Sequence, residues 1–151
     1  MARMHARRKG RSSSTRPYRT ASPEWTSISK EEIEEFITTQ GKEGMSSSRI
    51  GIILRDQYGV PSVKLATGRS ISAIWKEAGA APKIPEDMMN LLKRAVRLGT
   101  HLKENPRDIH NKRQLHLTEA KIRRLGQYYK KTGALPKGWK YNLNDARLMV
   151  E

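Results

Sequence analysis

Two stripes of residues with helical spacing, separated by Asn105-Pro106, constrain the fold of this chain more than any other feature. The residues recur at intervals of three and four and are Met88, Leu91, Ala95, Leu98 and Leu102, then Leu115, Thr118, Ile122, Leu125 and Tyr129. This pattern predicts one helix over about 85–104 and another over about 107–131 that stops at Gly133. Because so short a break separates the two helices, we expect an antiparallel helical hairpin.

Residues 29–79 carry the start and stop signals of several short helices. Ser29 and Glu32 have the spacing of a capping box, and Ser46 or Ser47 and then Ser70 can begin further helices. Short helices joined by glycine turns are typical of a small helical bundle and of a helix-turn-helix alike. No strand is predicted, and residues 135–151 are interpreted as an irregular tail. The predicted fold class is all-α, with a short-helix N-terminal module before the hairpin.

The charge of the chain indicates a polyanionic partner. It has 30 Lys and Arg against 15 Asp and Glu, a formal net charge of +15, which is typical of proteins that bind nucleic acid. The first twenty residues contain no acid and seven cations: Arg3, Arg7, Arg8, Lys9, Arg11, Arg16 and Arg19. We expect this basic arm to be disordered until a polyanion neutralises it, although a solubilising tail would have the same composition.

Catalytic, metal-binding and membrane functions find little support in the sequence. The absence of cysteine excludes disulfides, thiolate nucleophiles and zinc–thiolate sites, and the four histidines include no His-x-x-x-His pair. No run of 18 apolar residues is present, and the first twenty residues lack the apolar segment of a secretory signal. We therefore expect an intracellular protein with no catalytic residue, metal site, cofactor, small-molecule substrate or membrane partner.

A polar and mainly basic stripe runs beside each apolar one and is the candidate binding surface. Its members are Asp87, Asn90, Arg94, Arg97 and His101 on the first helix, and His110, Arg113, Leu117, Lys121, Arg124, Tyr128 and Lys131 on the second. A solvated helix face is the plain alternative. RNA fits better, since arginine and lysine meet phosphates and a tyrosine can stack on a base or ribose. His101, Asp108 and His110 are expected to converge at the turn.

Asp108 has two possible roles that can coexist. A carboxylate would be repelled by phosphate, so it needs a donor such as a guanine amino group or a ribose 2′-hydroxyl, both in the wide minor groove of A-form RNA. It is also well placed to cap the helix that follows Asn105-Pro106. The sequence leaves both roles open.

Two other functions remain open from the residues alone. A helix-turn-helix protein that binds DNA would use residues 47–58 as its recognition helix, which offers few groups for base edges. A protein-interaction scaffold would leave the concentration of positive charge in the arm and hairpin unexplained.

Several separated motifs, in the same order, resemble the S15 family of small-subunit ribosomal proteins. HLKENPRDIHNKRQL and KIRRLGQYYKKTGALPKGWKYN are similar to its RNA-binding core, and MARMHARRKG and IGIILRDQYGVPSVKLATG are similar to the archaeal and eukaryotic branch. The resemblance implies three parts: a basic arm over 1–27, a branch-specific helical extension over 28–64, and a four-helix rRNA-binding module with a C-terminal tail over 65–151.

The resemblance also implies a function and contact residues. Such a protein sits in cytoplasmic ribosomes, grips a three-way junction and a neighbouring minor groove of small-subunit rRNA, supports platform assembly beside other small-subunit proteins, and helps bridge to the large subunit. By position, His101 and Asp108 fall on minor-groove contacts, and Arg94 and Tyr128 on junction contacts. Asn111 and Gln114 stand where the bacterial pattern has serine and glycine. The predicted RNA-binding residues also include Asn111, Lys112 and, from the arm, Arg3, Arg7, Arg8, Lys9 and Arg11.

Overall fold

The described residues form α-helices and no β-strand, which confirms the all-α prediction. In the computed structural model of the chain these residues are 15, 17–26 and 28–150, so most of the predicted basic arm lies outside them. They divide into two compact units between Pro82 and Lys83. The predicted boundary after residue 64 separates a branch-specific extension from a shared module, and it stays a prediction.

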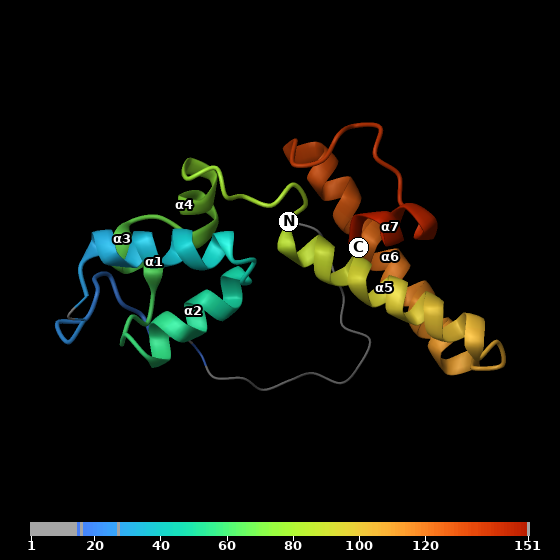
Figure 1. Cartoon of the computed structure of the whole chain (residues 1–151), viewed down its shortest axis with the longest axis horizontal. Coiled ribbons are helices and arrows are strands. Elements are labelled where there is room, and N and C mark those ends of the chain that lie inside the picture. Colours follow the sequence, from blue (N-terminus) through green and yellow to red (C-terminus); the bar gives the residue numbers. More distant parts are fainter. Residues whose placement is uncertain (1–14, 16, 27, 151) are drawn as a thin grey trace. The chain divides into compact units, whose positions relative to one another are not determined.

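The N-terminal unit contains four helices, which Figure 1 shows from blue to green. They are α1 (Lys30–Lys42), α2 (Ser47–Asp56), α3 (Val63–Thr67) and α4 (Ile71–Glu77). The predicted capping box begins α1, because Ser29 Oγ accepts from the Glu32 N–H at 3.2 Å while Glu32 Oε2 accepts from the Ser29 N–H at 3.0 Å. Ser46 Oγ accepts from the Arg49 N–H at the start of α2, and Ser70 Oγ accepts from the Ala73 N–H at the start of α4, so the predicted helix starts are confirmed.

Trp75, on α4, packs into the core of the N-terminal unit. The fully buried side chains around it are Ile33, Ile37, Ile50, Leu54 and Val60. Its indole Nε1–H donates to the Ile37 carbonyl at 3.0 Å, which satisfies a buried polar group. A Cβ atom on Gly41 would lie within 3.0 Å of three atoms of the indole ring, so α1 needs a glycine where the tryptophan crosses it.

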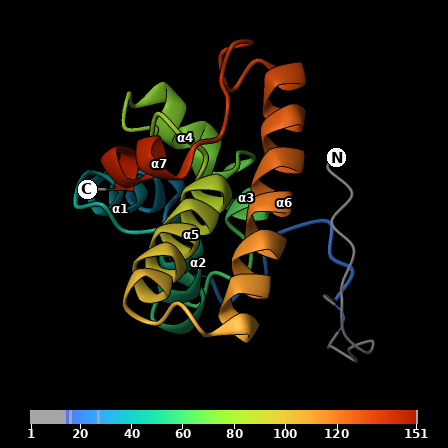
Figure 2. The same cartoon turned by 90° about the vertical axis from the view of Figure 1, so that its right-hand side faces the viewer.

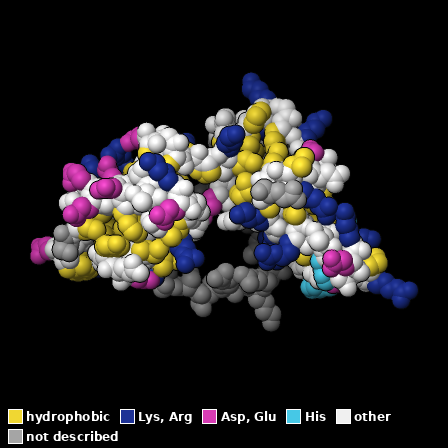
Figure 3. All heavy atoms as spheres, viewed as in Figure 1, with side chains coloured by type: hydrophobic (Ala, Val, Ile, Leu, Met, Phe, Trp, Pro, Cys, Tyr) yellow, Lys and Arg dark blue, Asp and Glu magenta, His cyan; other side chains and the backbone are white. Residues whose placement is uncertain are grey.

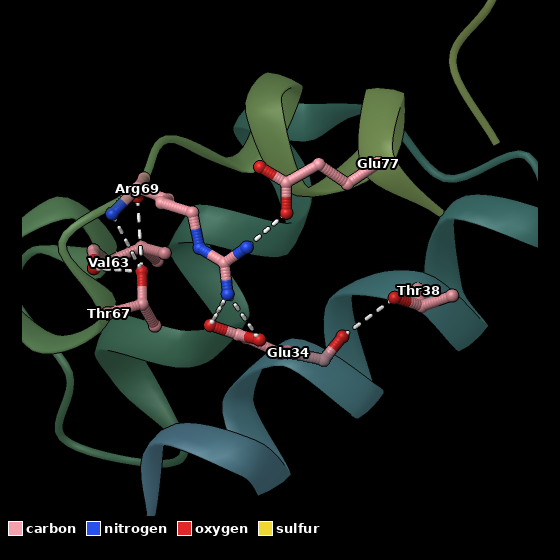
Figure 4. A network of polar contacts seen from close by, with 6 residues as sticks. All are labelled: Glu34, Thr38, Val63, Thr67, Arg69 and Glu77. Atoms are coloured by element: carbon pink, nitrogen blue, oxygen red, sulfur yellow. Dashed lines mark hydrogen bonds and ion pairs between the residues drawn. The ribbon is translucent and has the colours of Figure 1, made fainter. Parts of the chain in front are cut away.

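Arg69 joins three segments of the N-terminal unit (Figure 4). Its Nη2 donates to both carboxylate oxygens of Glu34 on α1, at 2.7 and 2.9 Å, and its Nη1 donates to Glu77 on α4. The hydrogen bond to Glu34, with the charge of that carboxylate, raises the pKa of Arg69 above its usual value. The three side chains are partly exposed, so we expect this network to orient the helices more than to stabilise them.

The C-terminal unit contains the predicted hairpin, which Figures 1 and 2 show as two long helices side by side. These are α5 (Glu86–Glu104) and α6 (Ile109–Thr132), and a third helix, α7 (Leu143–Val150), packs against α5. Pro85 occupies the cap position before α5. Gly133 ends α6 with a left-handed backbone (φ 77°), a conformation that glycine adopts readily, which confirms the predicted stop.

α7 corrects the prediction of an irregular tail over residues 143–150. Leu143, Ala146 and Val150 follow helical spacing and pack against the core of the C-terminal unit. A Cβ atom on Gly99 of α5 would meet Leu143 at 3.0 Å, so the start of α7 lies directly against α5. The prediction was wrong because this short helix gains its stability from tertiary packing, which local sequence signals do not report.

α7 also changes which residues of α5 are buried. The buried positions are Met88, Leu92, Ala95 and Gly99, whereas the predicted Leu91, Leu98 and Leu102 are half-buried. Since α5 contacts both α6 and α7, its buried face is turned toward both helices. On α6 the predicted Thr118, Ile122 and Leu125 are buried as expected.

Two tyrosines of the C-terminal unit donate to carboxylates. Tyr129 Oη donates to both oxygens of Asp87 at 2.7 Å, and burial, followed by this hydrogen bond, raises the pKa of Tyr129 well above its usual value. Tyr141 Oη donates to Glu119 at 3.4 Å, and burial, followed by the charge of Glu119, raises the pKa of Tyr141 to about 12. Both hydroxyls are therefore held in the protonated state when the unit is folded.

Replacing Tyr141 with phenylalanine is expected to make the C-terminal unit less sensitive to alkaline pH. The pKa of Tyr141 is about 12 in the folded chain, above the ordinary tyrosine pKa of 10.0. The protonated hydroxyl therefore contributes its full stabilisation below about pH 10, and this contribution is lost as the pH rises toward the folded-state pKa. Across this window the unmodified chain should lose more stability than the variant, by less than about 1.4 kcal/mol per pH unit. Urea unfolding at about pH 8 and about pH 11 measures the difference.

The matched control is Tyr18→Phe, because Tyr18 is 94% exposed. It should lose as much stability at alkaline pH as the unmodified chain. An equal alkaline loss in Tyr141→Phe would contradict the assignment.

Candidate nucleic-acid interface

Asp108 is the structural centre of the hairpin turn. Its Oδ1 accepts from the Asn111 backbone N–H at 2.9 Å, which caps α6. Its Oδ2 accepts from the Asn111 side-chain amide at 2.7 Å and lies 3.0 Å from His101 Nε2. The backbone hydrogen bond from Asn111, with the side-chain bonds from His101 and Asn111, holds the pKa of Asp108 well below its usual range. The predicted cap is confirmed, and the carboxylate stays ionised at neutral pH.

His101 is oriented by the same network. Asp108 only accepts hydrogen bonds when ionised, so the proton of a neutral His101 belongs on Nε2, which donates to that carboxylate. Asn105 Nδ2 approaches His101 Nδ1 at 3.4 Å and donates to the His101 carbonyl at 3.2 Å. The ring is therefore held from both sides, while 41% of its side-chain surface remains exposed.

A partly exposed acceptor, held in position by fixed donors, thus lies at the turn. The Asp108 side chain is 28% exposed, and three hydrogen bonds use three of the roughly four acceptor positions of a carboxylate. One position is left for a donor from outside. Figure 3 shows histidine and acidic side chains gathered at this end of the α5–α6 hairpin, among basic ones.

The structure brings together only some of the residues predicted at the turn. Of the three expected to converge there, His101 and Asp108 meet. His110 is exposed on the first turn of α6 and takes no part in the bonds between them. Asn111 takes the place expected of His110. Lys112 and Arg113 lie on the same part of α6, and both are exposed.

The other predicted contacts lie along the hairpin. Arg94 and Arg97 are at the surface of α5, and Lys121, Arg124 and Lys131 are exposed on α6. Tyr128 is half-buried, with its ring tilted against Tyr129 at 5.2 Å between ring centroids. The arm residues of the predicted set are Arg3, Arg7, Arg8, Lys9 and Arg11, and they lie outside the described residues.

The positive charge is concentrated in one unit. Residues 83–150 contain 16 Lys and Arg against 6 Asp and Glu, whereas residues 28–82 contain seven of each. In Figure 3 the acidic side chains gather over the N-terminal unit, and basic ones follow α5 and α6. A polyanion is therefore attracted mainly to the hairpin.

A second row of polar residues on α6, two of them basic, was missed by the sequence reasoning. Arg123, Gln127 and Lys130 precede members of the predicted stripe by one residue, so they lie about 100° round the helix from it. They line a pocket together with Trp139 and Tyr141 of the following loop. The helical spacing of these three residues could have indicated a second polar face on α6. The position of the loop beside that face is known only from the fold.

Metal-binding and membrane-spanning features are absent from the part of the chain that the structure describes. There, no group of three or more histidine, aspartate or glutamate side chains is arranged to hold a metal ion. No helix in the same residues is both long enough and apolar enough to cross a membrane.

Comparison with family models assigns the chain to a known protein family. Residues 71–149 match the family model described as ribosomal protein S15, and residues 1–60 match the model described as the ribosomal S13/S15 N-terminal domain. The chain belongs to the S15 family of ribosomal proteins. The resemblance found in the sequence motifs is thereby confirmed.

Several archaeal members of the S15 family are similar to the chain over its whole length. The small ribosomal subunit protein uS15 of Methanococcus vannielii is 53% identical over 151 residues, which is 100% of both chains. The proteins of the same name from Methanocella arvoryzae and Methanoregula boonei are 51% and 53% identical over 150 residues, each alignment covering 99% of this chain.

Proposed function

We propose that this protein is a structural constituent of the small ribosomal subunit that binds a three-way junction and the adjacent minor groove of small-subunit rRNA. The observation that carries the proposal is the His101–Asp108–Asn111 network, an ionised and oriented acceptor set in a strongly basic hairpin. Membership of the S15 family and the similarity to uS15 proteins support the ribosomal setting.

The turn is suited to the minor groove because it offers an ionised acceptor that is fixed in position. Phosphate repels the Asp108 carboxylate, so its remaining acceptor position fits a guanine N2 amino group or a ribose 2′-hydroxyl. His101 and Asn111 already hold this carboxylate in one position, which reduces the entropy lost on binding. The turn therefore supplies specificity more than affinity.

The basic stripe supplies affinity through phosphate contacts. The proposed contacts are Arg94, Arg97, His110, Lys112, Arg113, Lys121, Arg124 and Lys131. Tyr128 is proposed at the junction, where its exposed portion can contact a ribose or base. The basic arm adds further phosphate contacts and orders when it binds.

The proposed partners follow from this role. They are small-subunit rRNA, neighbouring small-subunit proteins and, through a bridge, the large subunit. Binding supports assembly of the platform, and it requires no cofactor, small-molecule substrate or catalytic step. The proposed location is the cytoplasmic ribosome.

Salt-dependent binding of the full chain to an rRNA junction fragment tests the proposal. Duplex RNA and duplex DNA of equal length serve as competitors between about 0.05 and about 0.3 M salt. We expect the junction to keep a clear margin over both duplexes as the salt concentration rises. Equal binding to all three, lost together with salt, would contradict structured-RNA recognition.

A variant of the basic arm separates its contribution in the same experiment. Replacing Arg3, Arg7, Arg8, Lys9 and Arg11 with glutamine should flatten the salt dependence, by up to about 0.9 in slope for each phosphate that the arm no longer neutralises. An unchanged slope would show that the arm makes no phosphate contacts and serves only as a solubilising tail.

A further inference from the structure

A pocket of about 280 Å³ lies on α6, away from the predicted basic stripe. Arg123, Gln127 and Lys130 of α6 form one wall, and Trp139, Lys140 and Tyr141 of the following loop form the other. The volume is near the lower end of ligand-binding pockets, so it suits one small group and excludes a folded segment. The pocket lies wholly within the C-terminal unit.

Gly126 allows the pocket to form. A Cβ atom at this position of α6 would lie 2.6 Å from Cζ3 and 3.2 Å from Cε3 of Trp139, so any larger residue would push the indole away. The loop is held by a turn in which the Trp139 N–H donates to the Pro136 carbonyl at 3.0 Å. Both aromatic residues of the loop are half-buried, so each keeps some exposed ring surface.

The polar groups of the pocket are almost all donors. Arginine and lysine side chains have no acceptor, and Gln127 and the Tyr141 hydroxyl are the lining side chains that can accept. Glu119 is not among the lining residues, but its carboxylate lies 3.4 Å from Arg123 and 3.4 Å from the Tyr141 hydroxyl. It therefore offsets one of the three positive charges of Arg123, Lys130 and Lys140. The pocket is thus short of acceptor oxygens.

Trp139 also carries a buried donor that is left without a partner. Among the described residues, the Trp139 indole Nε1 is buried and has no hydrogen-bond acceptor. An unpaired buried donor carries a desolvation cost, which an incoming acceptor can relieve.

We propose that this pocket binds one nucleotide of an RNA strand, at a second RNA site beside the contacts of the hairpin. The phosphate oxygens accept from the basic side chains, and the ribose or base contacts the rings of Trp139 and Tyr141. A carboxylate from an acidic protein would also bring oxygens, but it would leave these rings unused. The site rests on the proposed function, since the same rRNA supplies the nucleotide.

Lys140→Gln, compared with Lys137→Gln, tests the phosphate contact. Both lysines are exposed in the same loop and both changes remove one charge, but only Lys140 lines the pocket. Salt-dependent binding of the full chain to the junction fragment should show a slope smaller by about 1 for Lys140→Gln and no change for Lys137→Gln. Equal slopes in the two variants would overturn the proposal.

Ultraviolet crosslinking of the unmodified chain to the same RNA tests the aromatic contact. After digestion with trypsin, a nucleotide should remain attached to residues 138–140 or 141–147, which carry Trp139 and Tyr141. Crosslinks confined to the hairpin, or an unchanged slope for Lys140→Gln while the junction still binds, would overturn the pocket and leave the proposed function intact. Loss of preference for the junction in the unmodified chain would instead overturn the proposed function.

Discussion

Replacing Asp108 with alanine is expected to weaken binding to the rRNA junction by roughly 5- to 150-fold, which corresponds to one base contact. The same change should lower the melting temperature of the C-terminal unit by roughly 4–8 °C, because α6 loses its N-terminal cap. It also releases His101, whose Nε2 donates to that carboxylate. Binding to junction and duplex RNA, beside thermal unfolding, measures both effects.

Asp108→Ser separates the two roles of this residue. Serine is also a favoured cap, so the melting temperature should stay close to that of the unmodified chain. Its hydroxyl is shorter and uncharged, and it cannot reproduce the acceptor geometry that His101 and Asn111 fix. We therefore expect the serine variant to bind the junction as weakly as the alanine variant. Full affinity in Asp108→Ser would show that the carboxylate is a cap and makes no RNA contact.

Replacing Gly41 with alanine is expected to destabilise the N-terminal unit by about 1–3 kcal/mol. The new methyl group would overlap the Trp75 indole, whose Nε1–H donates to the Ile37 carbonyl. The indole must then move within a core that is already closely packed, and its buried hydrogen bond is strained. The gain in helix propensity on replacing glycine offsets only part of this cost. Urea unfolding followed by tryptophan fluorescence measures the change.

Gly51→Ala is the matched control, because it makes the same change inside α2. A Cβ atom at this position would meet Ile71 at 3.8 Å, an ordinary contact. With no overlap to relieve, alanine should stabilise the helix by about 0.5–1 kcal/mol. If both variants lost stability equally, the overlap with Trp75 would not be the cause.

The helix boundaries that could be predicted are those set by local chemistry. Ser29 and Glu32 satisfy each other's backbone across one turn, so the start of α1 depends on four consecutive residues. Asp108 and Gly133 bound α6 for similar local reasons. The observed buried face of α5 differs from the predicted one because Leu92 lies against α7. The residue pattern within α5 cannot predict a contact with a helix formed by residues much later in the chain.

The candidate site was predictable in part for the same reason. The cap by Asp108 is a local feature, and its partner His101 follows from folding the hairpin back on itself. Helical spacing does not settle which of His110 and Asn111 completes the network, since both lie in the first turn of α6. The pocket beside Arg123 could not be predicted, because one of its walls is the loop that carries Trp139. The path of this loop depends on the absence of a side chain at Gly126.

The uneven distribution of charge gives the protein a preferred orientation before any specific contact forms. Residues 28–82 carry as many acids as bases, so their net attraction to a polyanion at long range is weak. Residues 83–150 have an excess of cations and experience the field of RNA first. Diffusional encounters are thus biased toward the hairpin, and fewer collisions involve the neutral unit. The rate of association should therefore depend on ionic strength mainly through the C-terminal half of the chain and the arm.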